Sequence, residues 1–492
     1  MGRATANARW AFLGLGVKVA VQGIVGFYVL RVVGTATAGV MGIGLVYVAL
    51  TSLLLDQGMG QALIRAPEIK RSDVATVQVT TLWLAVGTGL VTVALAEPLG
   101  RFFDFAGLPA LLSVLAAGLI FKSVAVPGQA VLQRDFQFRW LAGCDMASAV
   151  LGMTASVVTA LNHGGAMALA AQILVTDGVY AAGVVRRSGA PFRGANMKAL
   201  REMLGFTSQI AGSQWLGFLS RNVDNILIGR VLGSVPLGNY SLSYRLMMLP
   251  ITNLTMVANR VLLPTYSRLQ HDLAGFRRSF LRSCKLMSLT ATPLMALLVV
   301  FASPLILGAL KPQYHGAILP TQVLAMVAII QAQTSLITPA IVAFGRTAWQ
   351  LKWMLISTLL TVAMFAGTVA WGLDAVCIGY LVLNVLTLPF PIMLVGRLGG
   401  FSLGDFVRAV APGLGIGAIV LAIGAAVRLG LEPLGTPLLV VGLGGGALSA
   451  LIAAPLVRIL MPQSTLDLLA LVSRGSRDPK TSLEVAAAAV AG

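Results

Sequence analysis

Long apolar stretches dominate the chain, and short polar turns separate them. A helix needs roughly 20 mainly apolar residues to cross the hydrocarbon core of a bilayer. Fourteen stretches meet this requirement, and we therefore predict an all-α integral membrane protein with about 14 transmembrane helices. The predicted spans are residues 10–32, 36–55, 75–98, 108–131, 141–161, 165–185, 204–230, 237–263, 285–308, 317–340, 350–371, 374–396, 409–428 and 437–459.

The composition supports a membrane location. Of the 492 residues, 57% are hydrophobic and only 11% are charged, whereas roughly a quarter of the residues of a soluble domain are charged. The formal net charge is +18, a value that is also typical of nucleic-acid-binding proteins. Here the basic residues lie in turns between apolar stretches, so we expect no nucleic-acid partner.

Lysine and arginine are divided unevenly between the two sets of turns. Loops on the cytoplasmic side of a membrane protein carry the excess of basic residues. If the N-terminus is cytoplasmic, the outward turns hold only a few basic residues, namely Arg31, Arg101, Arg230, Lys311 and Arg428. We therefore predict that both termini of this multi-pass protein lie in the cytoplasm.

The sequence offers little to a metal site or an active site. Its three cysteines and three histidines have no shared spacing, so we predict no disulfide framework, metal or cofactor. A membrane enzyme, such as a glycan polymerase, would normally carry catalytic carboxylates or histidines in substantial outer loops. The outer turns here are short, and we predict a protein that is not an enzyme.

One pattern occurs twice. Arg31, Gly34 and Gly39 lie where the first span ends and the second begins, and Arg230, Gly233 and Gly238 recur at a constant offset of 199 residues. The two copies are separated by six spans, an even number, so both halves enter the membrane in the same direction. This predicts two six-helix lobes related by a pseudo-two-fold axis along the membrane normal, with two C-terminal helices outside the repeat.

The repeat defines the predicted domain organisation, which has five parts. They are an N-terminal lobe at 1–185 with spans one to six, a cytoplasmic linker at 186–203, a C-terminal lobe at 204–396 with spans seven to twelve, spans thirteen and fourteen at 397–461, and a cytoplasmic tail at 462–492.

Several ionisable side chains lie within the predicted spans, where each costs at least ~2.5–3.5 kcal/mol unless it faces a partner or a cavity. Four are basic, and we predict that they line a cavity that binds an anionic headgroup: Lys18, Lys122, Arg221 and Arg245. Guanidinium groups suit bidentate binding of phosphate. Two alternatives stay open, since Arg221 could pair with Asp224 within its own helix and Lys122 could extend toward the membrane surface.

Acidic residues inside the spans suggest a second role. Asp177 and Asp224 are candidates either for ion coupling or for structural pairing with a basic neighbour. A buried carboxylate can change its protonation when its surroundings change. Asp145 lies close to the predicted cytoplasmic end of its span, and we interpret it as interfacial.

Residues 266–285 have apolar side chains at helical spacing and several arginines on the other positions. The pattern favours either a helix on the inner leaflet, with its basic face toward anionic lipid, or a simple positive topology anchor. Prolines in or near spans further predict kinks. They are Pro250, Pro264, Pro293, Pro304, Pro339, Pro389, Pro391 and Pro412.

Three segments resemble a known family. Residues 221–245 read RNVDNILIGRVLGSVPLGNYSLSYR, residues 263–270 read LPTYSRLQ, and residues 132–139 read LQRDFQFR. The first is similar to the seventh-to-eighth-helix signature of bacterial oligosaccharide flippases. These form the polysaccharide-transporter branch of the multidrug/oligosaccharidyl-lipid/polysaccharide exporter superfamily. The resemblance covers about residues 10–460.

The resemblance implies a flippase in the bacterial plasma (inner) membrane. It would move polyprenyl-pyrophosphate-linked oligosaccharide units to the outer leaflet by alternating access, for polymers of the exopolysaccharide or O-antigen type. A polysaccharide polymerase or export machinery is the partner that it implies. Flippases of lipid-linked peptidoglycan precursors and drug or cation antiporters of the same superfamily are the alternatives.

Overall fold

The computed structural model describes residues 25–56, 70–189 and 221–460, together with positions 23, 60, 63, 64, 217 and 218. The described part is helical and contains no strand. Lys18, residues 190–203 of the predicted linker and the predicted tail lie outside the described residues.

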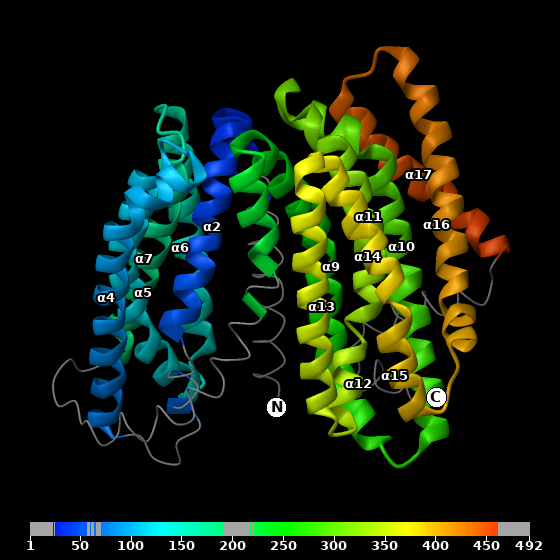
Figure 1. Ribbon diagram of the computed structural model, residues 1–492, viewed down its shortest axis with the longest axis horizontal. Helices are drawn as coiled ribbons and strands as arrows, with labels where there is room; N and C mark the ends of the chain where they lie inside the picture. The colour runs from blue at the N-terminus through cyan, green and yellow to red at the C-terminus, as the bar shows by residue number, and fades with distance from the viewer. Residues whose placement is uncertain are drawn as a thin grey trace. The chain divides into compact units, whose positions relative to one another are not determined.

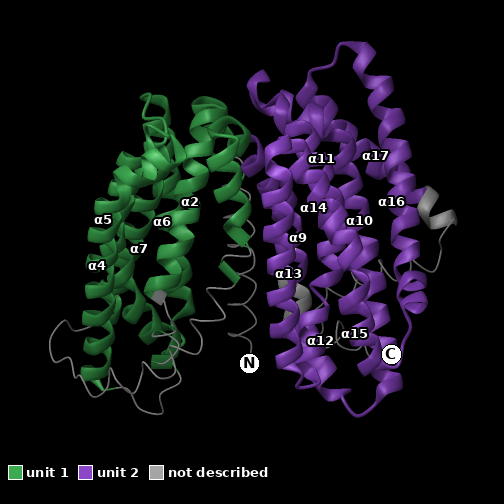
Figure 2. Cartoon of the chain, viewed as in Figure 1, with its two compact units in different colours: residues 1–238 green, residues 239–492 purple. Residues whose placement is uncertain are grey.

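The chain divides into two compact units, residues 1–238 and 239–492 (Figure 2). The division falls later than the predicted linker, so residues 221–238 group with unit 1. The long helices of unit 1 run alongside one another (Figure 1). They are α2 (Thr35–Asp56), α4 (Arg71–Phe103), α5 (Leu108–Arg134), α6 (Phe138–Leu161) and α7 (Met167–Ser188).

Tight turns connect the helices of unit 1. Asp104, Phe136 and His163 each have a positive φ, between 55° and 59°, at the points where the chain reverses. Asp104 ends α4 in the left-handed conformation, and its N–H donates to the carbonyl of Gly100. Such short connections make consecutive helices antiparallel neighbours, and α4 packs on α5 as α6 packs on α7.

Unit 2 contains most of α9 and all the helices that follow it. The helices are α9 (Ser234–Arg268), α10 (Leu273–Ala309), α11 (Ile318–Thr334), α12 (Ile337–Ala343), α13 (Thr347–Thr368), α14 (Leu373–Thr387), α15 (Pro389–Gly399), α16 (Leu403–Leu431) and α17 (Leu438–Leu460). Short 3₁₀ helices lie at Pro312–Ala317, Val369–Trp371 and Glu432–Leu434.

The predicted membrane architecture is confirmed in the described part of the chain. Eleven helices there are long and apolar enough to cross a membrane, and α9 covers the predicted eighth span. The first and seventh predicted spans lie partly outside the described residues. The all-α class is therefore established, and the count of 14 is consistent with the structure.

Two predicted spans are broken rather than continuous. The span at 317–340 divides into α11 and α12, and the span at 374–396 divides into α14 and α15. Proline has no N–H to donate to the carbonyl four residues earlier. Pro339 and Pro389 therefore leave the carbonyls of Ser335 and Val385 without their helical donors, close to the two breaks.

Residues 266–285 differ from the prediction of a helix on the leaflet. Arg268 ends α9, Asp272 caps α10 by accepting a hydrogen bond from the N–H of Gly275 at 2.9 Å, and α10 continues for 37 residues into the ninth span. Phe276 and Phe280 are fully buried. Their rings pack against Tyr266, Phe344 and Phe401. The helical spacing is confirmed and the apolar face packs against protein, whereas contact of the basic face with anionic lipid stays a prediction.

The helices outside the predicted repeat pack closely on α10. We call the contact between α10 and α16 the α10–α16 seam and define it by Ser288 and Thr292 on α10 and Val410, Gly413 and Gly417 on α16. The Ser288 hydroxyl donates to the carbonyl of Val410 at 2.9 Å. A Cβ at Gly413 would lie 2.5 Å from the carbonyl carbon of Ser288, and one at Gly417 would lie 2.5 Å from Cγ2 of Thr292. Only glycine allows the helices to approach this closely.

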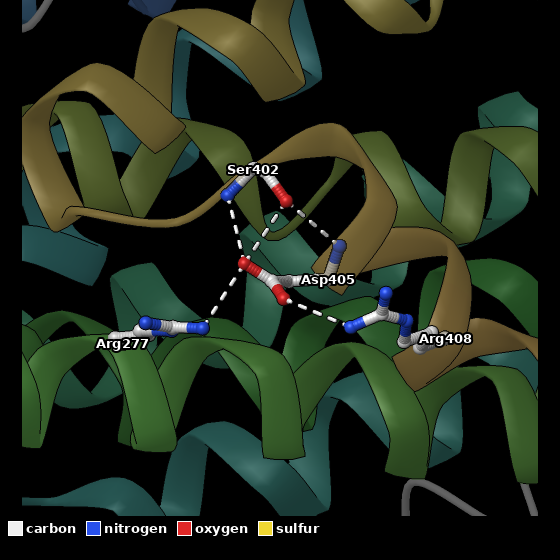
Figure 3. Close-up of polar contacts among 4 residues, drawn as sticks. All are labelled: Arg277, Ser402, Asp405 and Arg408. Atoms are coloured by element: carbon white, nitrogen blue, oxygen red, sulfur yellow. Dashed lines mark hydrogen bonds and ion pairs between the residues drawn. The ribbon is translucent and has the colours of Figure 1, made fainter.

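A polar cluster holds the beginning of α16 to α10 (Figure 3). Ser402 and Asp405 form a capping box, in which each side chain accepts a hydrogen bond from the other's backbone N–H, at 3.2 and 3.0 Å. Arg277 of α10 reaches the same Asp405 carboxylate at 3.1 Å, and Arg408 lies 3.8 Å from it. Arg277, which belongs to the basic segment at residues 266–285, therefore joins α10 to α16.

Candidate functional site

Unit 1 encloses a cavity of about 550 Å³ among α2, α5, α6 and α7, which we call the unit 1 cavity. Its size falls within the range of small-molecule binding sites. Several ionisable or polar side chains line it: Ser52, Lys122, Gln129, Gln133, Asp145, Thr176, Asp177 and Tyr180. Apolar helices thus surround a pocket with a polar wall.

Lys122 reaches this cavity from the middle of α5. Its ammonium group donates a hydrogen bond to the hydroxyl of Ser52 on α2. Asp177, on α7, lines the same cavity and attracts Lys122 electrostatically. The structure thus brings together two of the predicted residues, each with a partner that reduces the cost of a charge inside the bilayer.

Asp145, which we predict to lie close to the cytoplasmic end of its span, also lines the cavity. It is placed on the second turn of α6 and faces the unit 1 cavity. Among the described lining residues, one cation therefore shares this cavity with two carboxylates. Such a set can take up or release a proton, or bind a cation. The carboxylates of Asp145 and Asp177 compensate an added positive charge, and the ammonium group of Lys122 compensates a carboxylate that loses its proton.

Arg221 and Asp224 lie on the helical segment that begins at residue 221. Asp224 is only 4% exposed, and its carboxylate accepts hydrogen bonds from the backbone N–H and the side-chain amide of Asn225 at 2.7 and 3.0 Å. The Arg221 side chain is exposed in unit 1. Asn225 is not basic, so ion coupling and pairing with a basic neighbour both stay predictions for Asp224.

Arg245 lies on α9 directly after Tyr244, whose ring stacks on that of Tyr240 at a centroid distance of 6.0 Å. Its side chain is exposed on the surface of unit 2. Arg221 and Arg245 belong to different compact units. Their convergence on one headgroup, together with Lys18, stays a prediction.

The two copies of the repeated pattern have the same backbone conformation. Gly34 has a φ of 86° and Gly233 a φ of 91°, and α2 and α9 begin directly after them. Only glycine adopts this conformation without strain. The arginines of the two copies, Arg31 and Arg230, are both exposed, and the Arg230 guanidinium lies 5.1 Å from the ring centroid of Phe102.

The same two turns also contact each other. A Cβ at Gly39 would overlap the carbonyl oxygen of Ser234, and a Cβ at Gly238 would overlap the carbonyl oxygen of Thr35. Thr35 and Ser234 are separated by the same 199 positions as the two glycines. The contact is therefore reciprocal, as a local two-fold axis between the beginnings of α2 and α9 requires.

Comparison with known sequences gives one family match and several relatives. Residues 29–319 match the family described as polysaccharide biosynthesis protein. The teichuronic acid biosynthesis protein TuaB of Bacillus subtilis (strain 168) is 25% identical over 354 residues, which cover 70% of this chain and 71% of TuaB. The lipopolysaccharide biosynthesis protein WzxC of Escherichia coli (strain K12) is 23% identical over 395 residues, covering 77% and 78%. The succinoglycan biosynthesis transport protein ExoT of Rhizobium meliloti (strain 1021) is 24% identical, covering 73% of each chain.

Solved structures share the fold. The inward closed conformation of the lipid II flippase MurJ superposes with a TM-score of 0.71 at 11% identity and covers 91% of this chain and 98% of MurJ. An inward-facing multidrug resistance MATE family transporter of the MOP superfamily superposes with a TM-score of 0.61 at 16% identity, covering 80% and 99%. At these identities the similarity concerns the fold alone.

Proposed function

Because the chain belongs to the family of polysaccharide biosynthesis proteins, we propose that it is a flippase for polyprenyl-pyrophosphate-linked oligosaccharide. It is a multi-pass membrane transporter of the inner membrane and not an enzyme, as its relatives and its fold are those of transporters. The family match over residues 29–319 carries the proposal. The MurJ and MATE similarities add no preference for a peptidoglycan precursor or a drug.

The proposed direction of transport is from the cytoplasmic to the outer leaflet, with both termini in the cytoplasm. The substrate units serve polymers of the exopolysaccharide or O-antigen type, and a polymerase or export machinery consumes them on the outer side. Alternating access is the proposed mechanism. The shared backbone conformation of Gly34 and Gly233 supports it, since alternating access in transporters commonly depends on internal repeats.

We propose two different roles for the charged residues within the spans, headgroup binding and ion coupling. Lys18, Arg221 and Arg245 bind the pyrophosphate of the headgroup, because the two guanidinium groups match phosphate oxygens and the Lys18 ammonium adds a third positive charge. Lys122, with Asp145 and Asp177, couples transport to an ion, because among the described residues an ammonium group shares the unit 1 cavity with two carboxylates. This role departs from the predicted contact of Lys122 with the headgroup.

Flipping is tested with purified protein in liposomes. One leaflet is loaded with a polyprenyl-pyrophosphate oligosaccharide, and a sugar-binding probe restricted to the other leaflet follows its arrival. We expect crossing well above that in protein-free liposomes. No crossing with several sugar structures, with and without a proton gradient, would contradict the proposed function.

The headgroup assignment is tested by Lys18→Ala, Arg221→Ala and Arg245→Ala in the same assay. Each lost charge-assisted hydrogen bond is worth roughly 1.5–3 kcal/mol, so we expect a fall of about tenfold or more in initial rate. Arg101→Ala is the matched control, because Arg101 lies on the exposed surface paired with Glu97 at 3.3 Å. Normal transport by all three variants at normal expression would contradict the assignment.

A further inference from the structure

Unit 1 has a second hollow that shares no residue with the unit 1 cavity. It measures about 600 Å³ and lies between the beginning of α6 and the end of α7. We call it the α6–α7 groove. Its lining includes Arg139, Trp140, Gly143, Ala147, Gly183 and Arg187.

The rim of the α6–α7 groove is basic and ordered by side-chain contacts. Arg187 donates from Nε to the side-chain oxygen of Gln137 at 2.9 Å, and its guanidinium lies 5.9 Å from the centroid of the Trp140 ring. Trp140 donates from Nε1 to the carbonyl of Gly183 at 3.0 Å. The Gln137 bond uses one of the five guanidinium donors of Arg187. The position of the cation is thus set without neutralising its charge.

No acidic side chain is among the described residues that line this groove. Within the described part of the chain, Arg139 and Arg187 form no ion pair with a carboxylate. Two guanidinium groups in one hollow suit the oxygens of a phosphate diester, which they can bind through paired hydrogen bonds. The charge of the rim therefore favours an anion.

The floor of the groove is apolar and made of small side chains. Gly143 and Ala147 come from α6, and Gly183 comes from α7. A Cβ at Gly143 would meet no atom within 4 Å. Large apolar side chains on the same helix are exposed, with Met146 at 45% and Val150 at 57%. On a helix that spans a membrane, exposed side chains of this kind contact lipid, so the floor continues onto a surface suited to an acyl chain.

We propose that the α6–α7 groove is a binding site for an anionic phospholipid of the adjacent leaflet, such as phosphatidylglycerol. The phosphate lies between Arg139 and Arg187, and an acyl chain runs over Gly143 and Ala147. A zwitterionic phospholipid fits less well, because its amine adds a positive charge beside two arginines. Under the proposed orientation the groove faces the cytoplasmic leaflet. The bound lipid fills the space between the beginning of α6 and the end of α7.

Trp140 provides a direct probe, because it lines the groove. The other six of the seven tryptophans are replaced by phenylalanine, and the protein is placed in phosphatidylcholine liposomes. A small fraction of lipid with brominated acyl chains then quenches the fluorescence by contact. Each basic residue near an anionic headgroup contributes roughly a fivefold preference. With two arginines, we therefore expect brominated phosphatidylglycerol to quench at about a twenty-fivefold lower mole fraction than brominated phosphatidylcholine.

Two variants separate charge from shape. Arg139→Gln combined with Arg187→Gln is expected to remove the preference between the two lipids, whereas Gly143→Leu is expected to weaken quenching by both. Arg186→Gln is the matched control, because Arg186 is exposed beside Arg187 but does not line the groove. Thermal stability in detergent identifies any variant that fails to fold, and native mass spectrometry of the unmodified chain then counts retained phosphatidylglycerol independently.

Three results would overturn the proposal. The first is equal quenching by the two brominated lipids, and the second is a preference that survives loss of both arginines. The third is quenching that requires a polyprenyl phosphate and is absent with phosphatidylglycerol, which would assign the groove to the transported lipid. Flipping activity is measured separately, so failure of the lipid site leaves the proposed transport function standing.

Discussion

Polar side chains lie inside the helix bundle of both units, but their surroundings differ. In unit 1, Lys122, Asp145 and Asp177 face a cavity of about 550 Å³. At the α10–α16 seam of unit 2, Ser288 and Thr292 meet glycines, and the helices leave no room for a methyl group. Buried hydroxyls that bond to backbone are satisfied where they are, whereas ionisable groups beside open volume can respond to a ligand or a proton. Of these two regions, only the unit 1 cavity combines polar side chains with open volume, and it is therefore the candidate for function.

Breaking the seam is expected to have the largest effect. Gly413→Leu places a branched side chain where even a Cβ lies 2.5 Å from the carbonyl carbon of Ser288, so the backbone must move. Overpacking of a close contact typically costs about 1–3 kcal/mol or more. We therefore expect loss of folded protein or a large fall in Tm, measured by thermal denaturation in detergent.

The matched control for the seam is Gly430→Ala on the same helix. A Cβ at Gly430 meets no atom within 4 Å, so its Tm should stay close to that of the unchanged protein. An equal Tm for Gly413→Leu would show that the seam is not a close contact in the membrane.

Neutralising the unit 1 cavity is expected to reduce transport and leave the fold intact. Lys122→Met and Asp177→Asn each remove one member of an interacting pair, and such pairs have coupling energies of roughly 0.5–3 kcal/mol. Each single variant should therefore lose stability. The double variant should recover much of that stability, because the charges of Lys122 and Asp177 are lost together and the described lining keeps its net charge, that of Asp145.

The double variant of the unit 1 cavity should lose transport at nearly normal Tm, whereas variants of the α10–α16 seam should lose stability. We expect the double variant to flip substrate about tenfold or more slowly, and its dependence on a proton gradient to disappear, although its Tm is near normal. The liposome assay and thermal denaturation measure the two properties on one preparation. Normal, gradient-dependent transport by the double variant would remove the cavity from the mechanism.

The spans were predictable because a bilayer imposes a simple requirement on hydrophobic length. The ends of α5 and α7 lie within three residues of the predicted ones at every boundary. Prolines were less informative from the sequence. Pro250, Pro264 and Pro412 lie within continuous helices, whereas Pro339 and Pro389 lie beside breaks. Neighbouring helices decide between these outcomes, and a single sequence does not show them.

The sequence indicated which residue types belong to the candidate site, but not which of those residues share one cavity. An ionisable residue inside an apolar span is conspicuous, so Lys122 and Asp177 were found. Asp145 was interpreted as interfacial because its depth was known and its direction was not. The apolar face of residues 276–284 shows the same limit, since the spacing predicted a buried stripe but not whether protein or lipid covers it.

The smallest expected effect concerns the beginning of α16, where the polar cluster of Figure 3 holds the seam at its end. Ser402→Ala removes the hydroxyl that accepts from the N–H of Asp405 at 3.2 Å. Loss of such a cap costs about 1 kcal/mol, so we expect a modest fall in Tm and unchanged transport. Arg277→Ala should change Tm less, because its side chain is 46% exposed and exposed ion pairs contribute little.

The ranking of these variants tests what holds the last helices of unit 2. Arg408→Ala is the control for the cluster, since its side chain is 84% exposed and 3.8 Å from Asp405. If packing of glycine against Ser288 dominates, Gly413→Leu should lower Tm far more than Ser402→Ala, and Ser402→Ala more than either arginine variant. A fall in Tm for Arg277→Ala as large as that for Gly413→Leu would mean that the charged end of α16, rather than the seam, holds it to α10.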